Sequence, residues 1–167
     1  MAQDSQPGSP TTTLPITLRG KLTLEAELKR LIFEERPNIV KAIEEARAHG
    51  DISENAEYDA AKERQGMIEG RIAEIQGKIA GAEVVDPATI KSDRIVFGAT
   101  VEIKDTDTDE KFKYQIVGMD EANVKQEKIS IVSPLARAMI GKKVGDPFTV
   151  QSPKGDKDFE VLSFKFV

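Results

Sequence analysis

The chain has 167 residues, a formal net charge of −5 and no cysteine, which excludes disulfides and thiolate metal sites. An acidic protein is a poor partner for duplex DNA, because neutralisation of the phosphates drives that binding, although local contact with RNA stays open. The sequence has no apolar run long enough to span a membrane and no cleavable signal pattern, so we expect a cytoplasmic protein without a membrane partner.

The start of the chain, residues 1–15, is polar, rich in proline and glycine and without periodicity, which predicts a flexible tail. A first helix is predicted from about Thr17 to Ala48, where apolar residues return at helical spacing. Its apolar seam is irregular, because Glu35 falls on it and Pro37 removes a backbone donor from the helix interior. We therefore expect a bent helix with an apolar face formed by Leu24, Leu28, Leu31 or Ile32, Ile39, Ile43 and Ala46.

A second helix, from about Ser53 to Ala82, has a more regular seam with steps of three and four residues. The seam residues are Tyr58, Ala61, Gln65, Ile68, Ile72, Ile75, Ile79 and Ala82. Because the break between the two helices is short, we expect an antiparallel coiled-coil hairpin over residues 16–85. A hairpin used only for packing or dimerisation is an open alternative at this point.

The turn between the helices carries two acids that have two possible roles. Gly50 suits the left-handed residue that ends a helix, and Asp51 or Ser53 can cap the next one. Asp51 and Glu54 have the spacing of a capping box, so they either only start a helix or project beyond its end. In the second case they offer hard oxygen ligands to a Mg²⁺ that takes further ligands from a partner. The single histidine, His49, is expected to cap the first helix.

The pattern changes at Asp86-Pro87, where a linker of residues 86–94 leads to a second domain, residues 95–167. Alternating segments predict a mostly antiparallel sheet with strands at 99–104, 111–117, 128–132, 148–151 and 159–166, and a short helix at 134–140. The acidic run 105–110 lacks the ligand spacing of an EF-hand, so it predicts a solvated hairpin turn. The expected core comprises Phe97, Phe112, Phe148, Phe159 and some of Phe164 and Phe166.

Motifs in both halves closely resemble the bacterial GreA/GreB transcript cleavage factors, nearer to GreA, from about Ile16 to the C-terminus. The most specific is His49-Gly50-Asp51-x-Ser53-Glu54-Asn55-Ala56-Glu57-Tyr58. A second, some eighty residues later, is Ser133-Pro134-x-Ala136-Arg137-Ala138-x-Ile140-Gly141-Lys142. The others are Thr17-Leu18-Arg19-Gly20, Leu24-x-x-Glu27-Leu28-x-x-Leu31, Arg36-Pro37, Ala46-Arg47 and Phe97-Gly98-Ala99-x-Val101.

The resemblance implies a transcription elongation factor that is not itself an enzyme but activates RNA cleavage by bacterial RNA polymerase. Such factors bind a backtracked polymerase and insert their coiled coil into its secondary channel. By their place in the motif, Asp51 and Glu54 would share a Mg²⁺ with the polymerase and orient the attacking water. The nascent RNA would then be cut near its 3′ end. We expect a monomer that holds no stable metal by itself.

The same resemblance implies an FKBP-like fold for residues 95–167, docked on the coiled coil at the rim of the channel. The candidate docking residues are Asp120, Glu121, Ser133, Pro134 and Leu135. Ser133 and Pro134 also have the residue types that cap and start a helix, which is compatible with docking.

A basic strip that guides the RNA 3′ end is also predicted on the hairpin, formed by Arg47, Lys62 and Arg64, with Arg71 as a further member. The alternative is that these are solvated helix charges paired with Glu44, Glu45, Glu63 and Glu74, and for Arg71 this alternative is at least as good.

Two other functions stay open. One is a Gre-like inhibitor that occupies the channel without stimulating cleavage, against which the intact pair Asp51 and Glu54 argues. The other is a prolyl isomerase or chaperone, suggested only by fold analogy.

Overall fold

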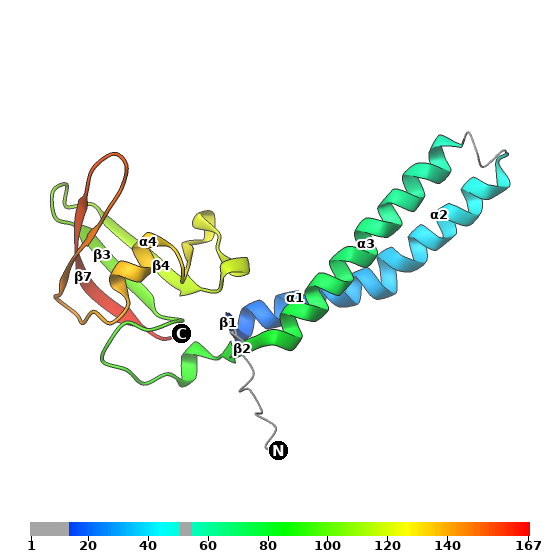
Figure 1. Ribbon diagram of the computed structural model, residues 1–167. Helices are drawn as coiled ribbons and strands as arrows, with labels where there is room; N and C mark the ends of the chain where they lie inside the picture. The colour runs from blue at the N-terminus through cyan, green and yellow to red at the C-terminus, as the bar shows by residue number, and fades with distance from the viewer. Residues whose placement is uncertain (1–13, 51–54) are drawn as a thin grey trace, which may run out of the picture.

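A computed structural model describes residues 14–50 and 55–167, which form a helical hairpin followed by a sheet domain (Figure 1). The hairpin comprises strand β1 (Leu14–Thr17), helix α1 (Leu18–Arg30), the π-helical turn η1 (Leu31–Glu35), helix α2 (Arg36–Ala48), helix α3 (Ala56–Gly81) and strand β2 (Ala82–Val85). The first three helical segments form one continuous arm that lies antiparallel to α3 (Figure 1). The predicted antiparallel helical hairpin is therefore confirmed.

The first arm stays helical at Pro37 because the turn before this residue is a wider π-helical turn. The backbone N–H of Arg36 bonds to the carbonyl of Leu31, five residues earlier, as in a π-helix. Pro37 has no N–H to donate, and in a regular α-helix its ring would crowd the carbonyl of Phe33. The predicted irregularity at this proline takes the form of the π turn, and the arm continues to Ala48.

An apolar seam between the arms forms the hairpin core. Its buried residues are Ile16, Leu24, Leu31, Ile39, Ile43, Ala61, Ile68, Ile72 and Ile75, and Tyr58, Ile79 and Ala82 pack partly buried against them. Each buried isoleucine contributes roughly 1.5–3 kcal/mol, whereas an exposed ion pair contributes about 0–1 kcal/mol. The seam therefore holds the arms together, as its spacing predicts.

A two-stranded parallel sheet closes the base of the hairpin, and local periodicity did not predict it. Strand β1 pairs with β2 in a register that runs from Leu14 opposite Ala82 to Thr17 opposite Val85. Strand β1 begins two residues inside the segment predicted as a tail, and Ala82, the last residue of the predicted helical seam, begins β2. The pairing joins segments far apart in the chain, so neither segment carries the signal alone.

The sheet domain contains the short 3₁₀ turns η3 (Pro87–Thr89), η4 (Met119–Glu121) and η5 (Val124–Gln126) and helix α4 (Pro134–Met139). Its strands are β3 (Thr100–Asp105), β4 (Lys111–Val117), β5 (Lys128–Ser130), β6 (Pro147–Val150) and β7 (Lys157–Lys165). They form one sheet in the order β5-β4-β3-β7-β6, in which only the β4–β5 pair is parallel. The predicted α+β class, with a mostly antiparallel sheet and one short helix, is confirmed.

The core of this domain is more aliphatic than predicted. Its largest fully buried side chains are Ile95, Val101, Ile103, Ile116, Val117, Met139 and Val161. Among the candidate phenylalanines, Phe148 and Phe159 are buried, whereas Phe97, Phe112, Phe164 and Phe166 are only partly buried at its edge. Branched aliphatic side chains fill the space between the sheet and α4, and the larger rings close the margins.

The acidic run is a hairpin turn, as predicted. The carboxylate of Asp105 accepts hydrogen bonds from the backbone N–H groups of Asp107 (2.9 Å) and Thr108 (3.2 Å), which orders the turn between β3 and β4. Across residues 14–50 and 55–167 no group of three or more His, Cys, Asp or Glu side chains is placed to hold a metal ion. In the same residues no helix is long and apolar enough to cross a bilayer.

Candidate functional site

The far end of the hairpin is organised by Asn55. Helix α2 ends with His49 as its C-cap, and Gly50 follows with φ of +136°, a backbone conformation that favours glycine. On the other arm, Asn55 Oδ1 accepts a hydrogen bond from the N–H of Tyr58 (3.1 Å) and caps α3. Its Nδ2 donates to the carbonyl of Ala46 at the end of α2 (2.6 Å). One side chain therefore joins the ends of both arms.

This arrangement corrects the predicted start of the second helix. The helix begins at Ala56 and Asn55 caps it, so the prediction of a start at Ser53 with Asp51 or Ser53 as cap is wrong. Asparagine is as good an N-cap as serine or aspartate, and it also has a donor that can reach a second helix end. The signal was present in the sequence as an asparagine three residues before the first residue of the regular seam. Asp51 and Glu54 lie outside the described residues.

The basic strip divides into members with different partners. The guanidinium of Arg47 lies 5.7 Å from the centre of the Tyr58 ring, within range of a cation–π contact. Lys62 Nζ donates to the amide oxygen of Gln65 (3.1 Å). Among the described residues, neither Arg47 nor Lys62 forms an ion pair with an acid, whereas Arg64 Nη2 lies 3.4 Å from Glu35 Oε2. Arg47 and Lys62, both exposed near the tip, are the better candidates for contact with an anion.

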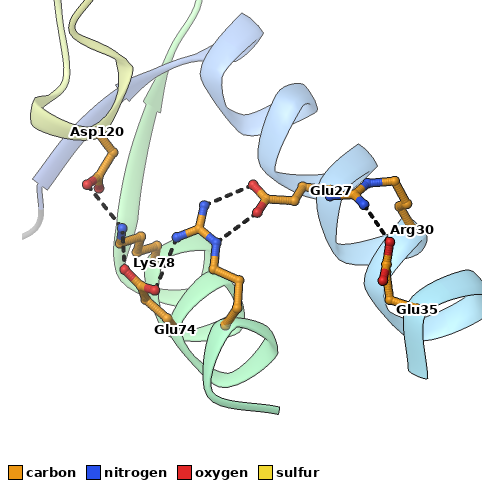
Figure 2. Close-up of polar contacts among 7 residues, drawn as sticks. Glu27, Arg30, Glu35, Glu74, Lys78 and Asp120 are labelled. Carbon is orange, nitrogen blue, oxygen red and sulfur yellow. Dashed lines mark hydrogen bonds and ion pairs between the residues drawn. The ribbon is translucent and has the colours of Figure 1, made fainter. Parts of the chain in front are cut away.

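Arg71 holds the hairpin together instead of extending the strip. Its Nε and Nη2 donate to the two carboxylate oxygens of Glu27 across the hairpin, at 2.8 and 2.9 Å (Figure 2). Its Nη1 lies 3.1 Å from Glu74, which confirms that pairing for Arg71. The hydrogen bonds from Arg71 lower the pKa of Glu27 against the opposing effect of burial. The sequence did not reveal Glu27 as a partner, because it lies on the other arm.

The predicted docking residues fall into two groups. Ser133 Oγ accepts a hydrogen bond from the N–H of Ala136 (3.2 Å), and Pro134 is the exposed first residue of α4. Leu135 packs partly buried against the domain core. This confirms the predicted helix start and leaves the proline face open to a partner.

The two acids predicted for docking face the hairpin. Asp120 Oδ1 lies 3.0 Å from Lys78 Nζ on α3, and Lys78 also contacts Glu74 at 2.9 Å (Figure 2). Glu121 accepts hydrogen bonds from both the backbone and the hydroxyl of Thr17. We therefore assign Asp120 and Glu121 to the contact between the two domains, which a search for exposed acids could not have identified.

An apolar groove of about 570 Å³ lies along this contact. It is open between the hairpin base and the sheet domain, and Met119 and Val132 on its wall are exposed. Its apolar lining residues are Leu14, Pro15, Ile16, Ala82, Met119, Ile131 and Val132.

Both halves of the chain match families of known proteins. Residues 14–84 match the family model described as "Transcription elongation factor, N-terminal", and residues 90–166 match "Transcription elongation factor, GreA/GreB, C-term". The transcription elongation factor GreA of Ralstonia nicotianae is 57% identical over 157 residues, which cover 93% of this chain and 99% of that protein. GreA of Halorhodospira halophila is 53% identical over 154 residues, 92% of this chain and 98% of that protein.

A solved chain described as a prokaryotic transcription elongation factor GreA/GreB, from Nitrosomonas europaea, is 21% identical with a TM-score of 0.41, over 92% of this chain and 99% of that one. The two family models together span nearly the whole described structure, and the curated relatives are matched over almost their full length. The chain belongs to the GreA/GreB transcription elongation factor family.

Proposed function

We propose that this protein binds backtracked bacterial RNA polymerase, inserts its hairpin into the secondary channel and stimulates the polymerase's own cleavage of the nascent RNA 3′ end. The observation that carries the proposal is the position of the acidic motif in the chain. Asp51 and Glu54 fall in the four residues between Gly50 and Asn55, where α2 has ended and α3 begins. Helix α3 has 26 residues, so at ~1.5 Å per residue the arm is roughly 39 Å long.

The rigid arm supports this role, because it is held along its whole length. The apolar seam, the Arg71–Glu27 pair and the Asn55 bridge leave the arm few ways to bend. An arm of that kind can enter a narrow channel as one unit. Precise placement matters, since a displacement of ~1 Å can cost about 100-fold in rate.

The two acids have the donor chemistry that a shared Mg²⁺ requires, since magnesium binds through one or two carboxylates while keeping waters and substrate ligands. A second metal ion in a phosphodiester site stabilises the attacking and leaving oxygens. Asp51 and Glu54 would hold that ion together with the polymerase, and one carboxylate would accept a proton from the attacking water. The protein would thus supply ligands and a base to an active site that belongs to its partner.

The exposed cations near the tip extend the proposal to RNA. Arg47 and Lys62 lie beside the end of the hairpin and would contact phosphates of the extruded 3′ end. Arg64 contributes less, because its charge is partly neutralised by Glu35. The face of α4 that begins at Ser133 and Pro134 would dock on the rim of the channel.

The test is RNA cleavage in a stalled, backtracked polymerase complex with Mg²⁺, comparing the unsubstituted protein with the Asp51→Asn/Glu54→Gln double variant. Both changes keep side-chain size while removing charge. We expect the unsubstituted protein to shorten the transcript from its 3′ end, and the variant to bind equally well but lose most of the stimulation.

Wild-type cleavage by the variant would contradict the role of the acids. Binding without cleavage by the unsubstituted protein would instead identify a channel-occupying inhibitor.

A further inference from the structure

We propose that Glu121 is a positioning residue, which sets the direction of the hairpin relative to the sheet domain by binding the first turn of α1. The inference rests on the proposed function for its consequence in cleavage, but the contact itself can be tested on the free protein. It assigns to Glu121 a role inside the molecule in place of the polymerase contact expected from the sequence.

The carboxylate of Glu121 is surrounded by donors from both domains. Its Oε2 accepts from the backbone N–H of Thr17 (3.0 Å) and from the backbone N–H of Gly118 (2.9 Å). Its Oε1 accepts from the hydroxyl of Thr17. Hydrogen bonds to an ionised acceptor are about twice as strong as neutral ones. The two bonds from Thr17 connect η4 of the sheet domain directly to the hairpin at the junction of β1 and α1, and the bond from Gly118 fixes the carboxylate on its own domain.

Thr17 passes this contact on to the helix. It is the N-cap of α1, and its hydroxyl oxygen accepts from the N–H of Gly20 (3.1 Å) while its proton is donated to Glu121. Thr17 is only 3% exposed, so the bonds are shielded from competing water. The negative charge of Glu121 also lies at the positive end of the α1 dipole. A carboxylate of one domain thus completes the cap of the first helix of the other.

Two glycines make room for this approach. A Cβ on Gly20 would fall on the carboxylate of Glu121. A Cβ on Gly118 would lie 2.7 Å from the carbonyl oxygen of Pro15 and 2.9 Å from Glu121 Oε2, which is closer than real Cβ contacts allow. Both glycines have backbone conformations open to other residues, so the need for glycine comes from close approach between the domains.

The neighbouring ion pair does not explain the orientation equally well. Lys78 and Asp120 are 28% and 49% exposed, so solvent screens the attraction and the pair contributes about 0–1 kcal/mol. It also joins two flexible side chains, whereas Glu121 binds backbone groups whose positions are set by secondary structure. Glu121 is therefore the group that restricts rotation at the hairpin base.

Small rotations at the base matter because the arm is long. For an arm of ~40 Å, a rotation of about 10° displaces the tip by roughly 7 Å. That is several times the misplacement that a catalytic group tolerates. The two hydrogen bonds from Thr17 to Glu121 would thus keep the acidic tip on the polymerase active site once the sheet domain has docked.

The contact can be measured in the full-length protein by electron–electron distance measurement between two spin labels. The chain has no cysteine, so Glu63→Cys on α3 and Lys113→Cys on β4, both at exposed positions, give one label in each domain. We expect a narrow distance distribution in this labelled protein. The matched control is Asp120→Asn, which removes one charge from the adjacent residue and should keep the distribution narrow.

Two variants weaken the contact between Glu121 and Thr17, one with a change in the sheet domain and one with a change in the hairpin. Glu121→Gln removes the negative charge and replaces one of the two acceptor oxygens by an NH₂ group, so the Thr17 hydroxyl and the two backbone N–H groups no longer all find an acceptor. Gly20→Ala places a methyl where the carboxylate lies, while alanine improves helix propensity by about 1 kcal/mol. We expect both to broaden the distribution, although the second does not weaken α1 itself. A narrow, unshifted distribution in both variants would overturn the proposal.

The consequence for cleavage is tested by separating binding from rate. Glu121→Gln should keep the polymerase affinity, because α4 is untouched, and lower the maximal cleavage rate at saturating protein by about tenfold. An unchanged maximal rate together with a broadened distribution would overturn the positioning role. If the unsubstituted protein binds without cleavage, the proposed function has failed, and the distance distributions alone decide whether Glu121 sets the hairpin direction.

Discussion

The guanidinium of Arg71 on α3 binds the carboxylate of Glu27 on α1 with two hydrogen bonds of 2.8 and 2.9 Å, although the residues are 44 positions apart (Figure 2). Arg71 also contacts Glu74 on its own helix, and Glu74 contacts Lys78, which reaches Asp120 of the sheet domain. Charges of alternating sign thus run from the first arm across the second to the other domain. Among the three acids of this row, Glu27 has the least exposed side chain.

The first prediction concerns the pH dependence of stability. Hydrogen bonding to Arg71 lowers the pKa of Glu27 below its ordinary value of 4.5, so the ionised form stabilises the folded state. This contribution is present above pH 4.5 and is lost as the pH falls through the lowered pKa of the folded state. We expect Glu27→Gln to melt at a lower temperature than the unsubstituted protein at pH 7, with a smaller difference at pH 3. A difference that does not shrink on acidification would contradict this assignment.

The second prediction concerns the bridge at the tip. Asn55→Ala removes the N-cap of α3 and the bond to Ala46, so the free energy of unfolding should fall by about 1 kcal/mol or more. Asn55→Asp keeps an acceptor for the N–H of Tyr58 but loses the donor to Ala46, so it should cost less. Urea denaturation followed by helical circular dichroism measures both, and equal losses would show that the bond to Ala46 dominates.

The third prediction separates the members of the basic strip. Arg47→Glu/Lys62→Glu reverses the two cations that lack an acidic partner among the described residues, and should weaken crosslinking to the RNA 3′ end in a backtracked complex. Arg64→Gln should have a smaller effect, because Glu35 already neutralises part of that charge. Unchanged crosslinking in the double variant would remove the strip from the proposed function.

The fourth prediction concerns docking through α4. Pro134→Asp places a charge on the exposed first residue of the helix, where an acid is favourable for the helix dipole, so folding should be preserved. We expect loss of polymerase affinity, whereas Pro134→Ala, which adds no charge, should bind with a smaller change. Circular dichroism checks the fold of both variants, and full affinity of Pro134→Asp would exclude this face as the docking surface.

Local patterns predicted much of this architecture. The regular seam from Tyr58 to Ile79 has one buried face, as its steps of three and four require. Ser133 followed by Pro134 starts a helix, and Asp105 orders a hairpin turn through its own neighbours. Each of these features depends on groups within a few residues of one another, so the sequence contains the whole signal.

The sequence by itself predicted the helical hairpin, the alternating polarity of the strands in the sheet domain and the acidic motif that resembles the GreA/GreB family. Only the tertiary structure decided the pairing of β1 with β2, the partner of Arg71, and the contact of Glu121 with Thr17. These contacts join groups far apart in the chain, and their geometry depends on how two separately formed elements meet. A charged side chain on a helix surface or a loop has many possible partners in sequence, and packing of the backbone selects one of them.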